Sequence, residues 1–145
     1  MECMANSDNV IRAGLTPKLR DIPNLVSGLT YSASLPSKHT VQPTPFLSSS
    51  EATLLYDPPV PEFSVLQVKI EPGTTESHPA LDGPSIAIVI DGTGSVGWDN
   101  DQQSLDVSKG SVFFVSAGIH VKLKASEHQG GELKIFRAFV EVDER

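Results

Sequence analysis

The feature that most restricts the fold is a series of short alternating segments in the second half of the chain. Residues 63–70 alternate apolar and polar side chains, and the Glu-Pro-Gly sequence after them predicts a strand that ends in a turn. Comparable segments follow, separated by glycine or polar residues: 85–90, 95–98, 105–107, 111–115, 121–124 and 133–142. Seven or eight short strands predict a sandwich or a jelly-roll barrel, because an open sheet would leave exposed edges. We therefore expect an all-β fold from about residue 62 onward.

Two of these segments allow a more specific expectation. Residues 85–90 are almost entirely apolar, which is typical of a buried strand. The Asp-Gly-Thr-Gly sequence at 91–94 follows directly and is typical of a tight turn. The sequence therefore predicts a hairpin that returns the chain into residues 95–98.

The first sixty residues have a different composition. Around residues 21–29, an Asp cap, an early proline and apolar positions predict a helix of about two turns, which Gly28 weakens. Residues 33–61 carry six prolines and a run of three serines, so we expect an extended connector there. Residues 54–56 could still form a short edge strand. The expected divisions are 1–32, 33–61 and 62–145.

Composition and charge exclude several classes of function. With 145 residues and 39% hydrophobic residues the chain can form one ordinary domain. A net charge of -7 argues against a nucleic-acid partner, because binding phosphates requires a basic face. The longest apolar run, residues 86–90, is far shorter than the ~20 residues of a membrane helix. The single cysteine, Cys3, and the absence of a signal-peptide pattern lead us to expect a cytoplasmic protein with no membrane partner.

Residues 110–120 resemble the second motif of the cupins, in which a glycine precedes a strand, a Pro-x-Gly turn and a histidine. Ser116 replaces the proline, and His120 comes one residue early. The first cupin motif should contain His-x-His and a glutamate, but this chain offers only His78, after Glu-Ser. A transition-metal site requires three or four ligands, so His78 and His120 are best interpreted as surface or turn histidines. No metal is expected in this half.

Other patterns in the second half also have simple structural interpretations. Residues 91–95 lack the Gly-Lys-Ser/Thr ending and the helix of a phosphate-binding loop. Residues 99–101 lack the spaced ligands of a calcium loop and are expected to form a solvated turn. Neither a Ser/His/Asp nor a Cys/His arrangement can be derived from the spacings. This half alone is therefore expected to be non-catalytic.

The opening segment points to a function. Residues 2–18 have the sequence Glu-Cys-Met-Ala-Asn-Ser-Asp-Asn-Val-Ile-Arg-Ala-Gly-Leu-Thr-Pro-Lys. It closely resembles the type I mannose-6-phosphate isomerases (phosphomannose isomerases), whose pattern is Glu-Cys-Met-Ala-x-Ser-Asp-Asn-x-Val/Ile-Arg-Ala-Gly-Leu-Thr-Pro-Lys. The resemblance is closest to the fungal enzymes. It continues at 21–23 and 29–31 and resumes at 112–117 and 136–140.

The resemblance implies roles for four residues. Members of this family are zinc-dependent isomerases that interconvert mannose 6-phosphate and fructose 6-phosphate. Arg12 matches the catalytic arginine, and Lys18 matches a position of the same pocket near the sugar phosphate. Glu2 and Asp8 match acidic positions close to it. From the residues alone, an ion pair between Arg12 and Asp8 is the alternative explanation for the arginine.

The family also implies a domain organisation. Its members have a catalytic cupin, an inserted helical domain and a degenerate C-terminal cupin. We therefore expect a remnant of the catalytic cupin at 1–32, with one short helix, a crossing segment at 33–61, and the degenerate cupin at 62–145.

The family's zinc ligands precede the Glu-Cys-Met-Ala motif, so this chain is expected to contain no metal ligand and to be inactive alone. The parent enzyme would supply mannose for GDP-mannose synthesis. The alternative is a free-standing, non-catalytic cupin that acts as a binding or regulatory module.

Overall fold

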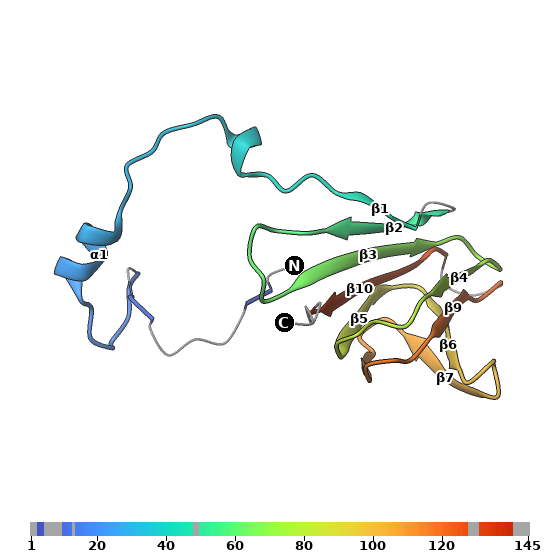
Figure 1. Ribbon diagram of the computed structural model, residues 1–145. Coiled ribbons are helices and arrows are strands. Elements are labelled where there is room, and N and C mark those ends of the chain that lie inside the picture. Colours follow the sequence, from blue (N-terminus) through green and yellow to red (C-terminus); the bar gives the residue numbers. More distant parts are fainter. Residues whose placement is uncertain (1–2, 5–9, 13, 48–49, 128–130, 141–145) are drawn as a thin grey trace. The chain divides into compact units, whose positions relative to one another are not determined.

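The structure is a computed structural model that describes residues 3–4, 10–12, 14–47, 50–127 and 131–140. The chain divides into two compact units, Met1–Thr40 and Val41–Arg145. The described helical segments belong to the first unit and the described strands to the second (Figure 1). Neither helical segment in these ranges is long and apolar enough to cross a membrane.

The predicted short helix in the first unit is confirmed and extends over Ile22–Gly28 (α1). The side chain of Asp21 accepts a hydrogen bond of 3.3 Å from a backbone N–H three residues further on. Pro23 lies in the first turn, where no intrahelical N–H donor is required. A single 3-10 turn (η1) follows at Pro36–His39. None of the described residues before Val41 is buried, so this part of the chain has no apolar core of its own.

The second unit consists of two antiparallel sheets (Figure 1). The larger sheet has the order β1-β2-β3-β10-β5-β8 and the smaller has the order β4-β9-β6-β7. The larger sheet contains β1 (Thr44–Leu47), β2 (Ser50–Tyr56), β3 (Ser64–Ile70), β5 (Ser85–Asp91), β8 (Val112–Val115) and β10 (Leu133–Phe139). The smaller sheet contains β4 (Thr75–His78), β6 (Thr93–Trp98), β7 (Gln103–Ser108) and β9 (Val121–Ala125). This two-sheet arrangement confirms the all-β, cupin-type jelly roll expected from the sequence.

The apolar core lies between the two sheets. Alternate residues of the long strands point inward, as in β10, where every second side chain is buried. Burial of one such side chain stabilises the fold by roughly 1.5–3 kcal/mol. The buried cluster consists of Leu66, Val68, Ile70, Ala87, Val89, Val96, Val107, Val115, Val121, Leu123, Ala125, Leu133, Ile135 and Phe139.

The strand prediction is confirmed after residue 62 and incomplete before it. Strands β3 and β5–β10 coincide with the expected segments. The sequence does not predict β4, because Thr-Glu-Ser-His contains no apolar residue. Two strands, β1 and β2, lie within residues 33–61, where a connector was expected. Residues 54–56 belong to β2, which pairs with β1 and β3 and is therefore not at the sheet edge.

The predicted hairpin at residues 91–94 is wrong. Strand β5 pairs with β8 and β10, whereas β6 pairs with β7 and β9 in the other sheet. Gly92 forms the corner between the sheets, with a φ of +79°. A Cβ atom there would lie 2.4 Å from the backbone oxygen of Glu132, so only glycine fits. The chain crosses to the second sheet at the point where the sequence predicted a return.

Candidate functional site

Arg12 and Lys18, the two cations assigned to a pocket by resemblance, lie in the first unit. Arg12 is partly buried and Lys18 is exposed. The backbone N–H of Lys18 donates to Oγ1 of Thr16 at 3.2 Å, which stabilises the Thr-Pro turn. Neither cationic side chain forms a hydrogen bond or ion pair with another described residue.

The two acidic residues assigned to the same pocket, Glu2 and Asp8, lie outside the described residues. The alternative ion pair between Arg12 and Asp8 lies there as well. The roles of all four residues remain predictions.

A second candidate site lies inside the barrel, on the strand that carries the degenerate first cupin motif. Glu76 and His78 are alternate residues of β4, so both point inward, and they are only 6% and 1% exposed. The interpretation of His78 as a surface or turn histidine is therefore wrong. The polar composition of β4 concealed a strand whose inward positions hold two ionisable side chains.

Thr53 on β2 connects these two side chains. Its hydroxyl donates to Oε1 of Glu76 at 2.9 Å and lies 2.9 Å from Nε2 of His78. A hydroxyl has one proton, so Thr53 must accept its second hydrogen bond from His78, whose proton is then on Nε2. Ser50 donates to Oε2 of Glu76 at 2.8 Å. Both carboxylate oxygens therefore have a donor.

Arg137 extends this network on the other side of the imidazole. It is 2% exposed and occupies an inward position of β10, among apolar residues. Its Nη1 lies 3.3 Å from Nδ1 of His78, and its Nε donates to Oγ of Ser85 at 2.9 Å. Because a guanidinium can only donate, Nδ1 must be the unprotonated nitrogen. The same tautomer satisfies Thr53, so the hydrogen bonds run in one direction from Arg137 to Glu76.

Electrostatics agree with this proton assignment. Burial, followed by the adjacent charge of Arg137, lowers the pKa of His78 to about 4, so the imidazole is neutral at neutral pH. Burial also lowers the pKa of Arg137 to about 10, which leaves the guanidinium charged at neutral pH. The ring of Phe46 packs against the imidazole in a T-shaped arrangement, with 5.5 Å between centroids.

The described part of the chain contains no group of three or more His, Cys, Asp or Glu side chains that could hold a metal ion. Inside the barrel, the atoms of Glu76 and His78 that would bind a cation already accept hydrogen bonds or donate them. The positive charge of Arg137 next to the imidazole further opposes a cation. These residues therefore do not fit a zinc site. Their hydrogen bonds have a structural role, because they connect the strands β2, β4, β5 and β10. The sequence contains one signal of this network: Arg137 falls on the same alternate positions of its strand as the apolar residues.

His120 is exposed, in agreement with its interpretation as a surface residue. It lies beside a pocket of about 360 Å³ at the β6–β7 turn, which Trp98 also lines. Nζ of Lys122 and Oδ2 of Asp101 form an ion pair of 2.5 Å in this pocket. The two opposite charges neutralise each other, so the pocket presents no free charge from this pair.

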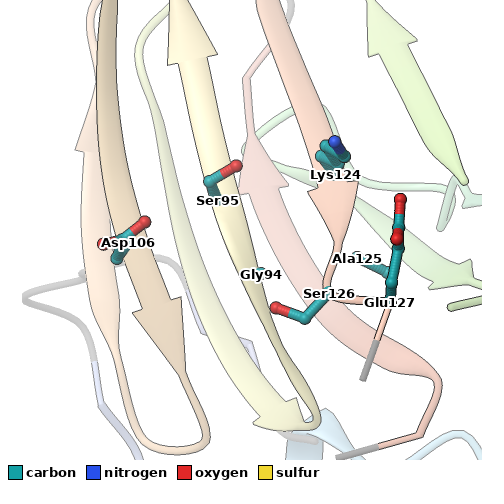
Figure 2. A pocket seen from close by; sticks show the side chains of 7 residues that line it. All are labelled: Gly94, Ser95, Asp106, Lys124, Ala125, Ser126 and Glu127. Atoms are coloured by element: carbon teal, nitrogen blue, oxygen red, sulfur yellow. The ribbon is translucent and has the colours of Figure 1, made fainter. Parts of the chain in front are cut away.

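An open depression of about 430 Å³ lies on the outer face of the smaller sheet (Figure 2). Ser95 pairs with Asp106 on one side and with Lys124 on the other, so their side chains form a polar row. Gly94 and Ser126 complete the floor and one end. The depression has no histidine that could activate a serine hydroxyl, and its charged side chains are exposed. It is a solvated sheet surface.

The family described as phosphomannose isomerase type I C-terminal matches residues 53–100. Mannose-6-phosphate isomerase of Cryptococcus neoformans is 48% identical over 142 residues, which cover 98% of this chain and 31% of that protein. The Schizosaccharomyces pombe protein of the same name is 41% identical over 144 residues, which cover 98% of this chain and 34% of that protein.

A solved structure shows the same relationship. Phosphomannose isomerase from Salmonella typhimurium is 26% identical, with a TM-score of 0.75 over 95% of this chain and 32% of that one. The chain therefore spans about a third of the length of the relatives that it matches.

Proposed function

We propose that the chain is the C-terminal part of a zinc-dependent mannose-6-phosphate isomerase, because residues 53–100 match the C-terminal family of the type I phosphomannose isomerases and the whole chain is similar to members of that family. That enzyme would interconvert mannose 6-phosphate and fructose 6-phosphate in the cytoplasm and supply mannose for GDP-mannose. The observation that carries the proposal is the 48% identity to a mannose-6-phosphate isomerase over 98% of this chain. The match includes the first unit as well as the barrel.

In this proposal Arg12 is the catalytic residue. The isomerisation transfers a proton between C1 and C2 through a cis-enediolate, so negative charge develops on an oxygen atom. A guanidinium keeps its charge and can donate two parallel hydrogen bonds, which stabilises such an oxygen. Arg12 is partly buried and makes no hydrogen bond or ion pair with another described residue.

Lys18 would bind the phosphate of the substrate. An ammonium is a compact point charge that suits a phosphate, and the turn at Thr16 limits the positions that Lys18 can adopt. Glu2 and Asp8 are assigned to the same pocket as further substrate-binding residues. These assignments rest on the positions of the four residues in the family motif.

The exposure of the first unit supports a larger parent protein. The side chains of Leu15, Leu19 and Leu35 are 103%, 88% and 75% exposed, which is unusual for large apolar residues. A segment that exposes so much apolar surface gains stability when other chain segments cover it. The remainder of the catalytic cupin in the relatives would be such a cover.

This chain alone is expected to be inactive. Zinc polarises the substrate oxygens in the family as a Lewis acid, and a guanidinium and an ammonium cannot replace that role. Purified chain supplied with zinc and mannose 6-phosphate should therefore show no turnover above background. Clear turnover would contradict the expected inactivity.

The function itself is tested with a chimera in which this chain replaces the matching C-terminal third of the Cryptococcus neoformans enzyme. We expect the chimera to be active with zinc, and Arg12→Ala to lower kcat by roughly 10²–10³-fold. Arg20→Ala is the matched control, because Arg20 is an exposed arginine in the same unit. An equal loss in both variants, or full activity of Arg12→Ala, would refute the catalytic role.

A free-standing, non-catalytic cupin module is the second candidate. The observation in its favour is that the second unit has one continuous core and an internal hydrogen-bond network of its own. Its described residues also contain no group that could hold a metal ion. An inactive chimera would favour this alternative.

A further inference from the structure

Part of the larger sheet is hydrophobic on the side that faces away from the core. The strand register places two rows of outward-facing side chains across β2, β3, β10, β5 and β8. All of them except Gln67 are hydrophobic. The rows, together called the apolar band, are Tyr56, Val65, Ala138, Ile86 and Phe114, and Leu54, Gln67, Phe136, Ile88 and Val112.

Much of this band is open to solvent at the β5–β8 end. Ile86, Val112 and Phe114 are 53%, 58% and 67% exposed. A shallow groove of about 340 Å³ lies here, between Phe114 and Ala138, with Phe63 at its rim. Given strand spacings near 4.8 Å and a two-residue repeat near 6.7 Å, the two rows cover about 300 Å². The largest apolar patch on a monomeric protein is typically about 300–600 Å² and is often functional.

The sequence of β5 indicates that both of its faces are meant to be covered. Its residues 86–90 form a continuous apolar run, which is typical of a strand buried on two sides. The core accounts only for Ala87 and Val89. The larger side chains of Ile86 and Ile88 point to the outer face of the sheet and remain 53% and 38% exposed.

The surroundings of the band support this interpretation. At one border, Nζ of Lys134 lies 3.6 Å from Oδ2 of Asp91 and 3.4 Å from Oε2 of Glu132. An apolar centre with a charged rim is the usual anatomy of a protein interface. The outer face of the smaller sheet differs, because its central row is Asp106, Ser95 and Lys124. Hydrophobic cover is therefore needed on one sheet only.

We propose that the apolar band is the surface on which the remaining two thirds of a mannose-6-phosphate isomerase dock. The inference rests on the proposed function, because the relatives carry this segment as about a third of a longer chain. A covalently attached domain has a high effective concentration, so a modest apolar patch is sufficient to hold it. The partner surface is expected to be uncharged and apolar opposite Ile86 and Phe114.

The test measures thiol accessibility on the band in the isolated chain and in the chimera. Ile88→Cys is introduced with Cys3→Ser, and Lys124→Cys in the same background is the control on the outer face of the other sheet. A maleimide is added, and the label is located by mass spectrometry. We expect the labelling rate of Ile88→Cys to fall about tenfold or more in the chimera, because the thiol becomes covered, while Lys124→Cys is unchanged.

The outcomes separate docking from catalysis. Equal labelling of Ile88→Cys in both proteins overturns the docking proposal, even if the chimera turns over mannose 6-phosphate. Protection that depends on the concentration of the isolated chain and is lost in the chimera identifies a second copy as the occupant and also overturns it. A protected thiol in an inactive chimera retains the docking surface and rejects the proposed function.

A second variant tests the same surface through stability. Phe114→Asp should leave the Tm of the isolated chain almost unchanged, because Phe114 is 67% exposed there. In the chimera it should lower the Tm, because a carboxylate would be buried in the interface. An unchanged Tm in both proteins would count against the proposal.

Discussion

The buried imidazole of His78 should make the stability of the barrel depend on pH in one specific window. Its pKa is 6.5 when exposed and is lowered to about 4 in the folded protein, mainly by burial and then by Arg137. As the pH falls below 6.5 the unfolded chain binds a proton that the folded chain does not bind. Stability is therefore lost between pH 6.5 and pH 4, and the loss from this residue ends below about pH 4. The pKa difference corresponds to about 3 kcal/mol.

The measurement is urea unfolding at several pH values, followed by the fluorescence of Trp98, the single tryptophan. Carboxylates titrate in the same range, so the wild type is compared with His78→Gln. Glutamine can donate to Thr53 and accept from Arg137, but it does not titrate. We expect the wild type to lose about 3 kcal/mol more than His78→Gln between pH 6.5 and pH 4. His120→Gln, at an exposed position, should behave like the wild type.

Equal pH dependence in the wild type and His78→Gln would refute this reasoning. It would mean that His78 is not held as a neutral donor and acceptor between its neighbours. The opposite result would be a wild type that becomes more stable relative to His78→Gln as the pH falls from 6.5 to 4. That result would show that the imidazole is charged in the folded state.

Three further predictions concern stability and exchange. Thr53→Val should destabilise the barrel by roughly 1–3 kcal/mol in urea unfolding, because it leaves buried polar groups without partners, whereas Thr53→Ser should retain most of the stability. Gly92→Ala should destabilise far more than Gly110→Ala in the same assay; both positions have a positive φ, but only at Gly92 would the Cβ meet the backbone. Amide hydrogens of residues 14–40 should exchange much faster than those of the strands in 64–125, since the first segment has no buried residue, and equal protection would contradict this.

The strands β3 and β5–β10 and the helix α1 could be predicted because their signals are local. Alternation with a period of two identifies β3 and β10 from neighbouring residues alone. The cap at Asp21 and the early Pro23 likewise lie within one turn of α1. The continuous motif around Arg12 permitted a family resemblance, which the comparisons with known proteins support.

Tertiary structure decided the features that depend on which strands pair. Thr53 and Glu76 are 23 residues apart, and His78 and Arg137 are 59 residues apart, so only sheet pairing brings these polar side chains into one network. The sequence around Gly92 predicts a hairpin although the chain turns a corner there, because both structures use a glycine with positive φ. The apolar band exists only in the register that aligns Ile86 with Phe114 and Ala138. Local periodicity determined which residues form strands, and long-range pairing determined which side chains meet, because partners distant in sequence leave no local pattern.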